Sequence, residues 1–287
     1  MMKIGIDSYC YHRFFGEVYP QQKKPARDVT LEWFIKRAHE LKVDGVAIEP
    51  PLVSRLDASY LSEIKGMLDE YKLDVVWAWG HPDGLEGGRN EKAFADMMKS
   101  FDYAAAVGAR VMRVCGASLM FRNEPHGPML EKLARMFSEA AREGQTRGIR
   151  VADENHIDFT SDEMLSLIKA VNSPYFGINF DTGNFMRVLD DPIKGMQKLA
   201  KYTFSTHVKD LKPNRRAAVD DWFFFSSTPV GDGLVDNQRL AQLLKTANYQ
   251  GFLAVEIDFL HPEYGEGEDK AVAQSIRELR RIAKAVG

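Results

Sequence analysis

The chain has 287 residues, of which 45% are hydrophobic, and its formal net charge at pH 7 is −3. This composition is typical of a globular protein with a large core, and the length fits one large domain as well as two small ones. Because acidic and basic residues are mixed along the chain, the charge gives no reason to expect nucleic acid or an anionic membrane as a partner.

The cysteines and the first residues bear on the cellular compartment. Cys10 and Cys115 lie far apart and have no Cys-x-x-Cys spacing, which predicts two free thiols in a reducing environment. The N-terminal stretch reaches Asp7 too early for a signal peptide, and no apolar run approaches the roughly 20 residues that cross a bilayer. We therefore expect a soluble, cytoplasmic protein without a membrane partner.

Short runs rich in β-branched and aromatic residues recur along the whole chain, separated by segments with helical periodicity. The eight expected strands are Lys3 to Tyr9, Gly45 to Glu49, Asp74 to Trp79, Arg110 to Cys115, Ile149 to Glu154, Phe176 to Asp181, Phe204 to Val208 and Phe252 to Ile257. Helical periodicity is clear at residues 31–41, 130–140 and 272–283. Two of the helix starts also carry local signals, since Thr160 to Glu163 has capping-box spacing and Asp191-Pro192 places a cap before a first-turn proline.

This alternation of strands and helices predicts an α/β protein with a parallel sheet. Eight units in this length predict a closed (β/α)8 TIM barrel that forms one domain over residues 1–287, with a doubly wound open sheet as the alternative. Two connections, from Cys10 to about Asp28 and from Leu211 to about Asp236, are much longer than most βα loops. Both leave the carboxyl ends of strands, where the active site of a barrel lies.

The same two connections are unusually rich in aromatic residues. Tyr9 to Tyr19 contributes five of them, and Trp222 to Phe225 contributes four. Such clusters are typical of a subunit interface, of loops that pack on themselves, of a lid, or of a surface for an apolar part of a ligand. We expect a homo-oligomer, and as the sharper alternative a substrate larger than a free sugar, such as a glycoside with an aromatic aglycone.

Four of the expected strands carry a residue of metal-ligand type at their carboxyl ends: Glu154, Asp181, His207 and Glu256. A charge at the end of a buried apolar strand needs a partner, and a barrel brings these ends to one rim. Three carboxylates and one imidazole suit one divalent ion, Mn2+ first and Mg2+ or Co2+ as alternatives, whereas a structural zinc site would favour cysteines. Taken singly, these residues also have structural interpretations as a helix cap, a core histidine or a salt bridge.

Several motifs resemble a known superfamily. They are Glu154-Asn155-His156, Asp181-Thr182-Gly183-Asn184, His207-Val208-Lys209-Asp210, Val230-Gly231-Asp232-Gly233 and Val255-Glu256, and they resemble the xylose-isomerase-like sugar isomerase/epimerase superfamily, which includes ketose 3-epimerases, hydroxypyruvate isomerases and inosose dehydratases. The resemblance spans nearly the whole chain and is strongest from residue 149 to 258. It implies a TIM barrel in which Glu154, Asp181, His207 and Glu256 hold a divalent metal. In the epimerase branch, the glutamates that match Glu154 and Glu256 also act as acid and base on opposite faces of the substrate.

The implied chemistry is proton abstraction next to a carbonyl. This step creates an enediolate, which a bound metal stabilises by several kcal/mol. Return of the proton to the opposite face gives epimerisation, return to the neighbouring carbon gives isomerisation, and loss of a β-oxygen gives elimination. We therefore predict a metal-dependent isomerase or epimerase that acts on a small carbohydrate.

The chain departs from the ketose 3-epimerase pattern at three positions. Asn184 stands where that pattern has His, Thr160 where it has Glu, and Pro213 where it has Arg. These departures favour, as the alternative, a metal-dependent lyase on a keto-polyol or 3-oxo-glycoside, such as inosose dehydratase or the large subunit of a C-glycoside deglycosidase. Relatives of the last kind work with a small partner subunit.

Further residues are candidates for the reaction or for substrate contacts. His156 could be a general base and Lys209 could bind a substrate oxygen, with a supporting hydrogen bond or a surface charge as the structural alternatives. The other candidates for substrate contacts are Glu49, His81, Arg113 and Asn184.

Two other classes of function fit less well. An abasic-site endonuclease on a related barrel needs about three zinc ions and more ligands than seven scattered histidines offer, and it favours a basic DNA-facing surface. A non-catalytic sugar-binding protein would keep the metal ligands but would exchange no proton on any keto-sugar.

Overall fold

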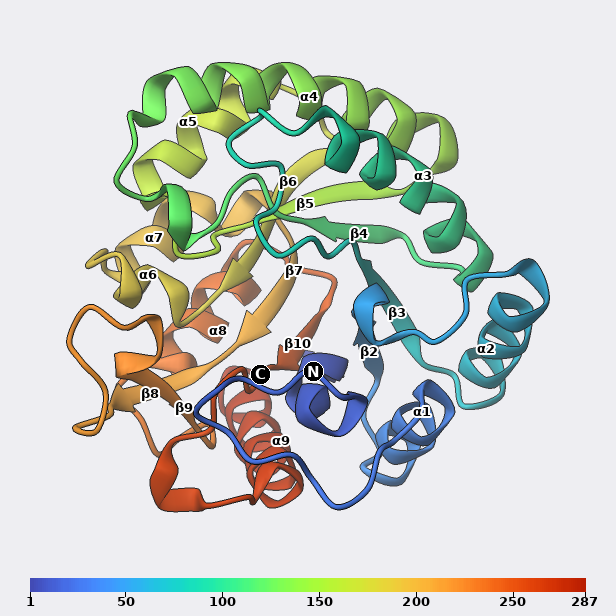
Figure 1. Cartoon of the computed structure of the whole chain (residues 1–287), viewed down its shortest axis with the longest axis vertical. Coiled ribbons are helices and arrows are strands. Elements are labelled where there is room, and N and C mark those ends of the chain that lie inside the picture. Colours follow the sequence, from blue (N-terminus) through green and yellow to red (C-terminus); the bar gives the residue numbers. More distant parts are fainter.

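The computed structural model describes all 287 residues and shows a closed barrel of eight parallel strands inside a ring of helices (Figure 1). The barrel strands are β1 (Lys3–Asp7), β2 (Gly45–Ile48), β3 (Asp74–Ala78), β4 (Val111–Val114), β5 (Arg150–Glu154), β6 (Phe176–Asp181), β7 (Thr203–Val208) and β10 (Phe252–Val255). Around the barrel their order is β1-β10-β7-β6-β5-β4-β3-β2. The predicted (β/α)8 barrel is confirmed.

The helices lie around the barrel strands (Figure 1). They are α1 (Leu31–Glu40), α2 (Ala58–Glu70), α3 (Glu91–Val107), α4 (His126–Arg147), α5 (Ser161–Val171), α6 (Asn184–Arg187), α7 (Pro192–Leu199), α8 (Asn237–Thr246) and α9 (Glu268–Ala285). None of them combines the length and the apolar character that crossing a membrane requires.

Apolar burial explains why these segments form these elements. Every residue of β6 is buried, as expected for a strand that has a barrel interior on one side and helices on the other. One continuous cluster of 63 buried apolar residues links barrel and helices, so the chain forms a single domain. Both predicted helix starts are confirmed: Thr160 and Glu163 form a capping box on α5, and Asp191 caps α7 ahead of Pro192.

Five of the eight barrel strands end one or two residues earlier than the sequence pattern predicts, whereas β5, β6 and β7 end at the predicted residues. β1 stops at Asp7, and a 3-10 helix, η1 (Ser8–Phe15), follows it instead of continued strand. Glu49 lies directly after β2, and Trp79 directly after β3. Trp79 is still buried and donates its backbone N–H to the carbonyl of Arg113, which is why an apolar pattern overestimates the strand.

The second long connection contains a hairpin that the sequence did not predict. Strands β8 (Asp210–Pro213) and β9 (Phe225–Thr228) pair antiparallel outside the barrel (Figure 1). The aromatic residues of the two long connections pack on one another, since the ring of Trp222 lies 5.1 Å from that of Tyr19. The ring of Phe259, in the loop after β10, lies 5.9 Å from that of Trp222. Cys10 and Cys115 are buried free thiols, as predicted.

Candidate metal centre

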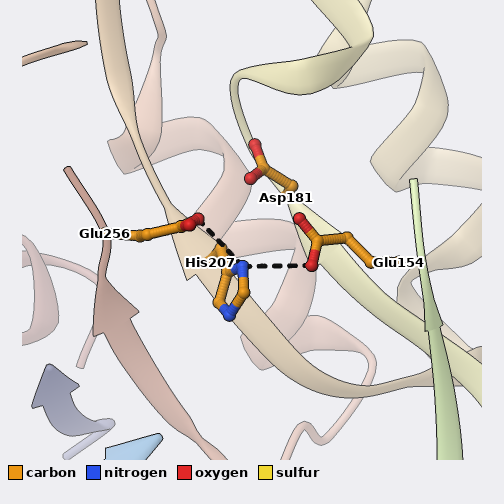
Figure 2. A group of neighbouring side chains, drawn as sticks. All are labelled: Glu154, Asp181, His207 and Glu256. Carbon is orange, nitrogen blue, oxygen red and sulfur yellow. Dashed lines mark ion pairs between the residues drawn. The ribbon is translucent and has the colours of Figure 1, made fainter. Parts of the chain in front are cut away.

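The four predicted ligands meet at the carboxyl end of the barrel. Glu154 ends β5, Asp181 ends β6, His207 is the penultimate residue of β7, and Glu256 directly follows β10. These four strands are consecutive neighbours in the barrel, so residues that are far apart in the sequence become adjacent. The four residues are at most 5% exposed, and their side chains point toward one another, with one ligand atom from each within 4.8 Å of the others (Figure 2).

Local hydrogen bonds orient the Asp181 carboxylate. Its Oδ1 accepts the backbone N–H groups of Gly183 and Asn184, both at 2.8 Å. The side chain of Asn155 bonds to both the N–H and the carbonyl of Asp181, which fixes the backbone at this strand end. Oδ2 is therefore directed into the cluster, where Lys209 Nζ lies 2.8 Å from it.

The His207 ring lies between carboxylates on both of its nitrogen sides. Nδ1 lies 2.9 Å from Glu256 Oε2 and 3.3 Å from Glu154 Oε2, and Nε2 lies 3.2 Å from Asp7 Oδ2. In metalloproteins, the nitrogen that does not bind the metal usually donates its proton to a carboxylate of this kind. The arrangement therefore favours Nδ1 as a metal ligand and Asp7 as the group that orients the ring.

The chemistry of these donors fits a divalent ion. Asp181 Oδ2, His207 Nδ1 and Glu256 Oε2 are buried, and they face one another and Lys209 Nζ at 2.8 to 3.1 Å. Three carboxylates and one imidazole suit Mn2+, Mg2+ or Co2+, and no cysteine belongs to the cluster. The four side chains could therefore hold one such ion.

Lys209 places a positive charge inside the same site. Its Nζ lies 2.8 Å from Asp181 Oδ2 and 3.1 Å from both Glu256 Oε2 and Asp258 Oδ2. Burial alone would lower the pKa of Lys209, but the carboxylates, Asp181 above all, outweigh burial and raise it well above the usual value. The ammonium group stays charged and can bind an oxygen of a substrate.

The carboxylates of the cluster differ in their pKa values. Burial raises the pKa of Asp181 to about 6. For Glu256 burial acts in the same direction, but His207 and Lys209 outweigh it and bring the pKa to about 2. For Glu154 burial is likewise outweighed, chiefly by Arg113, and the pKa lies well below the usual range. The two glutamates are therefore ionised at neutral pH.

Arg113 and Glu49 lie on one side of the cluster. The Arg113 guanidinium donates from Nε to Glu154 Oε2, and its Nη1 lies 3.4 Å from Glu49 Oε1. Burial raises the pKa of Glu49 to about 8, although Arg113 opposes the effect. Arg113 thus contacts two buried carboxylates, one of which belongs to the predicted ligand Glu154.

The remaining candidates lie at different distances from the cluster. Asn184 donates from Nδ2 to Glu154 Oε1 at 3.3 Å. His156 is partly buried, its Nδ1 has no hydrogen-bond partner, and burial lowers its pKa to about 4, so the ring is neutral at pH 7 and could accept a proton. His81 stacks on Trp79 and accepts the N–H of Asp83 at Nδ1, and it makes no hydrogen bond or ion pair with the four predicted ligands.

Comparison with known proteins identifies the family to which this fold belongs. The sequence profile described as "Xylose isomerase-like TIM barrel" matches residues 35–282, which is most of the chain. The chain belongs to the xylose isomerase-like TIM barrel family. The resemblance drawn from the motifs is thereby confirmed.

Curated relatives of this xylose isomerase-like chain include L-ribulose-5-phosphate 3-epimerase UlaE of Escherichia coli O157:H7 and of E. coli O139:H28. Each is 26% identical over 164 residues, 56% of this chain and 54% of the relative. The match spans about half the length of these curated relatives.

Solved structures share the fold over almost the full chain. A D-tagatose 3-epimerase-like protein is 17% identical with a TM-score of 0.75, covering 99% of this chain and 98% of its own. The 3-keto-D-glucoside 4-epimerase YcjR of E. coli is 19% identical with a TM-score of 0.71, covering 98% of this chain and 100% of its own.

Three residues near the centre of this xylose isomerase-like barrel escaped the sequence analysis. Asp7 seemed to lie inside a longer strand, so its position at a strand end was missed. Arg187 and Asp258 form a buried ion pair, with Arg187 Nη1 at 2.6 Å from Asp258 Oδ2. The sequence could have indicated Asp258 as a site residue, because it lies two residues after Glu256. No feature of the sequence pointed to Arg187.

We expect Asp7→Asn to weaken Mn2+ binding by about 10- to 100-fold, the usual effect of losing a carboxylate that orients a metal-binding histidine. Asparagine keeps an acceptor for the Tyr9 N–H that Asp7 Oδ1 now accepts, so the local turn is preserved. Calorimetric titration of chelator-treated protein with Mn2+ measures the effect. Asp44→Asn, an exposed change directly before β2, is the control. Equal affinity in Asp7→Asn and wild type would refute the role of Asp7.

Proposed function

We propose that this protein is a divalent-metal-dependent sugar isomerase or epimerase that removes a proton next to a carbonyl. The observation that carries the proposal is the convergence of Glu154, Asp181, His207 and Glu256, with one ligand atom of each within 4.8 Å of the others, at the catalytic end of the barrel. The curated relatives named L-ribulose-5-phosphate 3-epimerase support the reaction class.

The two glutamates suit proton transfer on opposite faces of a substrate. Glu154 comes from β5 and Glu256 from the end of β10, and they approach His207 from opposite sides (Figure 2). Both are ionised at neutral pH because nearby cations outweigh the effect of burial, so either can take a proton from carbon. When bound, a divalent ion supplies Lewis acidity that stabilises the charge developing on the substrate oxygens. One glutamate removes the proton and the other returns it, which inverts the carbon between them.

Two further groups fit supporting roles. The charged Lys209 Nζ, which lies among Asp181, Glu256 and Asp258, binds a substrate hydroxyl or carbonyl oxygen. The neutral ring of His156 offers an unpaired buried Nδ1 to a substrate hydroxyl. Both groups orient the sugar so that one C–H bond faces a glutamate.

A metal-dependent lyase is the second candidate, favoured by the structure around Asn184. Its Oδ1 accepts from Arg187 Nη1 at 3.0 Å and from Lys209 Nζ at 3.4 Å, so the side chain is engaged in binding neighbours at the position where the ketose 3-epimerase pattern has His. Thr160 and Pro213 also depart from the ketose 3-epimerase pattern, and both have structural roles here. Thr160 caps α5, and Pro213 ends β8. An enzyme of this kind would eliminate water or an aglycone from a keto-polyol or 3-oxo-glycoside, the latter with a small partner subunit.

Incubation of the Mn2+-loaded protein with ketoses and keto-sugars in D2O tests the proposal. We expect one deuteron at the carbon next to the carbonyl, with every hydroxyl retained, because the abstracted proton exchanges with solvent before it returns. Proton NMR and mass spectrometry measure exchange and product. Loss of water or aglycone would replace the isomerase with the lyase, and absence of both exchange and loss on all substrates would overturn the proposed function.

A further inference from the structure

Arg187 and Asp258 form a buried ion pair beside the metal-type residues. The Arg187 side chain is 2% exposed and that of Asp258 is 7% exposed. Arg187 Nη1 lies 2.6 Å from Asp258 Oδ2, and Nη2 lies 3.2 Å from Oδ1, so the contact is bidentate. Replacement of a buried ion pair by apolar residues often leaves stability unchanged, so stability alone does not explain this pair.

Arg187 determines which way the Asn184 amide faces. Asn184 Oδ1 accepts from Arg187 Nη1 at 3.0 Å and from Lys209 Nζ at 3.4 Å. Two cationic donors on one side of the amide require its oxygen there, because the amide nitrogen only donates. The nitrogen therefore faces Glu154 and donates to Oε1 at 3.3 Å. The direction of this hydrogen bond to a glutamate of the site thus depends on Arg187.

Asp258 provides the second contact with the site. Its Oδ2 lies 3.1 Å from Lys209 Nζ. The same ammonium group also lies 2.8 Å from Asp181 Oδ2 and 3.1 Å from Glu256 Oε2. Of these three carboxylates, only Asp258 is not a predicted metal ligand, so it stays available to Lys209 when the other two bind an ion. Arg187 fixes Asp258 by its bidentate contact and thereby fixes this anchor of Lys209.

The β8–β9 hairpin holds the ion pair from outside the barrel. Arg187 Nη2 donates to the carbonyl of Phe225 at 2.9 Å, and the guanidinium carbon lies 5.3 Å from the centre of the Trp222 ring. Ser227 Oγ donates to Asp258 Oδ1 at 2.7 Å. The pair therefore has a fixed direction as well as a balanced charge.

We propose that Arg187 is a positioning residue of the active site. Through Asn184 it directs a hydrogen bond to Glu154. Through Asp258 it holds Lys209 beside the substrate. The inference rests on the proposed function, in which the glutamate moves a proton and the lysine binds a substrate oxygen.

Arg187→Lys tests this role, because lysine keeps the charge that Asp258 needs but lacks the planar fork that reaches Asp258, Asn184 and the Phe225 carbonyl together. We expect kcat for proton exchange in D2O to fall at least about 10-fold while KM changes less than about threefold, since small misplacements of reacting groups are costly. Mn2+ should raise the melting temperature as in the wild type, because Arg187 contacts none of the four predicted ligands. An unchanged kcat, or a loss confined to KM, would overturn the inference.

Arg37→Lys is the matched control. Arg37 also makes a bidentate contact, with Asp269, and it makes no hydrogen bond or ion pair with the metal-type residues. This substitution should leave kcat unchanged. An equal loss of kcat in both variants would assign the effect of Arg187→Lys to general destabilisation and overturn the inference.

A double-substitution cycle tests the path through Asn184. In an Asn184→Ala background, the loss of kcat caused by Arg187→Lys should be at least about threefold smaller than in the wild type, because part of the path is already removed. Effects that simply multiply would show that Arg187 does not act through Asn184.

The side-chain amide resonance of Asn184 reports the contact without turnover. It is identified in an amide NMR spectrum by its absence from Asn184→Ala, and it should shift in Arg187→Lys but not in Arg37→Lys. This shift together with no proton exchange in the wild type would refute the proposed function and leave the contact in place. Exchange in the wild type at a rate that Arg187→Lys does not change would refute the positioning role alone.

Discussion

Asp181→Asn is expected to lower kcat at least about 1,000-fold and to abolish the stabilisation of the protein by Mn2+. The change removes a ligand charge while keeping the Oδ1 acceptor that Gly183 and Asn184 use, so the strand end stays in place. A bound metal contributes several kcal/mol to stabilising charge in the transition state, and each 1.4 kcal/mol corresponds to about tenfold in rate.

Thermal unfolding with and without Mn2+ gives a readout that is independent of turnover. An ion present at about 100 times its dissociation constant stabilises the folded chain by about 2.7 kcal/mol, so Mn2+ should raise the melting temperature of the wild type by several degrees. Asp181→Asn should show no such rise. Asp69→Asn, an exposed change on α2, should respond like the wild type. A normal Mn2+ response in Asp181→Asn would remove Asp181 from the metal site.

Arg113→Met is expected to destabilise the metal-free protein by about 3–5 kcal/mol, because it leaves Glu154 and Glu49 buried without their cation. The Arg113 side chain is only 8% exposed and contacts both carboxylates. Thermal unfolding in the presence of a chelator should show a melting temperature lower by roughly 10 °C.

The loss should be greater at pH 8 than at pH 6. Burial already raises the pKa of Glu49 to about 8 in the folded chain, and removal of Arg113 raises it further. Because the folded chain then holds a proton that the unfolded chain releases, stability is retained at low pH and lost as the pH rises toward the folded pKa. Protonation at pH 6 relieves the uncompensated charge.

Arg55→Met is the matched control for Arg113→Met. Arg55 pairs with Asp57 at the surface, where its side chain is 55% exposed, and solvent screening leaves such pairs with little effect on stability. Equal effects of the two substitutions, or a greater effect of Arg113→Met at pH 6 than at pH 8, would show that the buried ion pair does not support the site as described.

The metal-type residues were predictable because their positions depend on local pattern alone. Glu154, Asp181, His207 and Glu256 each follow a short apolar run, and parallel strands that close into a barrel must bring such positions to one rim. The prediction needed no knowledge of which side chains touch. Asp7 follows the same rule and was missed only because the apolar pattern continues past the true end of β1 into η1.

The ion-pair partners of the buried carboxylates could not be predicted from local sequence pattern. Arg113 pairs with Glu154 across 41 positions, and Arg187 pairs with Asp258 across 71. A charged residue in a sequence shows its charge but not its partner, since many other arginines here pair at the surface. The β8–β9 hairpin could not be predicted either. Its strands, Asp210–Pro213 and Phe225–Thr228, pair antiparallel, but the segment between them carries no sequence signal for a tight turn.

By itself, the sequence determined the barrel, its helix caps and the set of metal-type residues, because hydrophobic periodicity and capping act over a few neighbouring residues. Only the tertiary structure decided that Lys209 lies among the carboxylates, that Asp7 faces the His207 ring, and that Arg113 contacts both Glu154 and Glu49. Those features depend on side-chain directions from segments far apart in the chain, and the closing of the barrel is what fixes these directions.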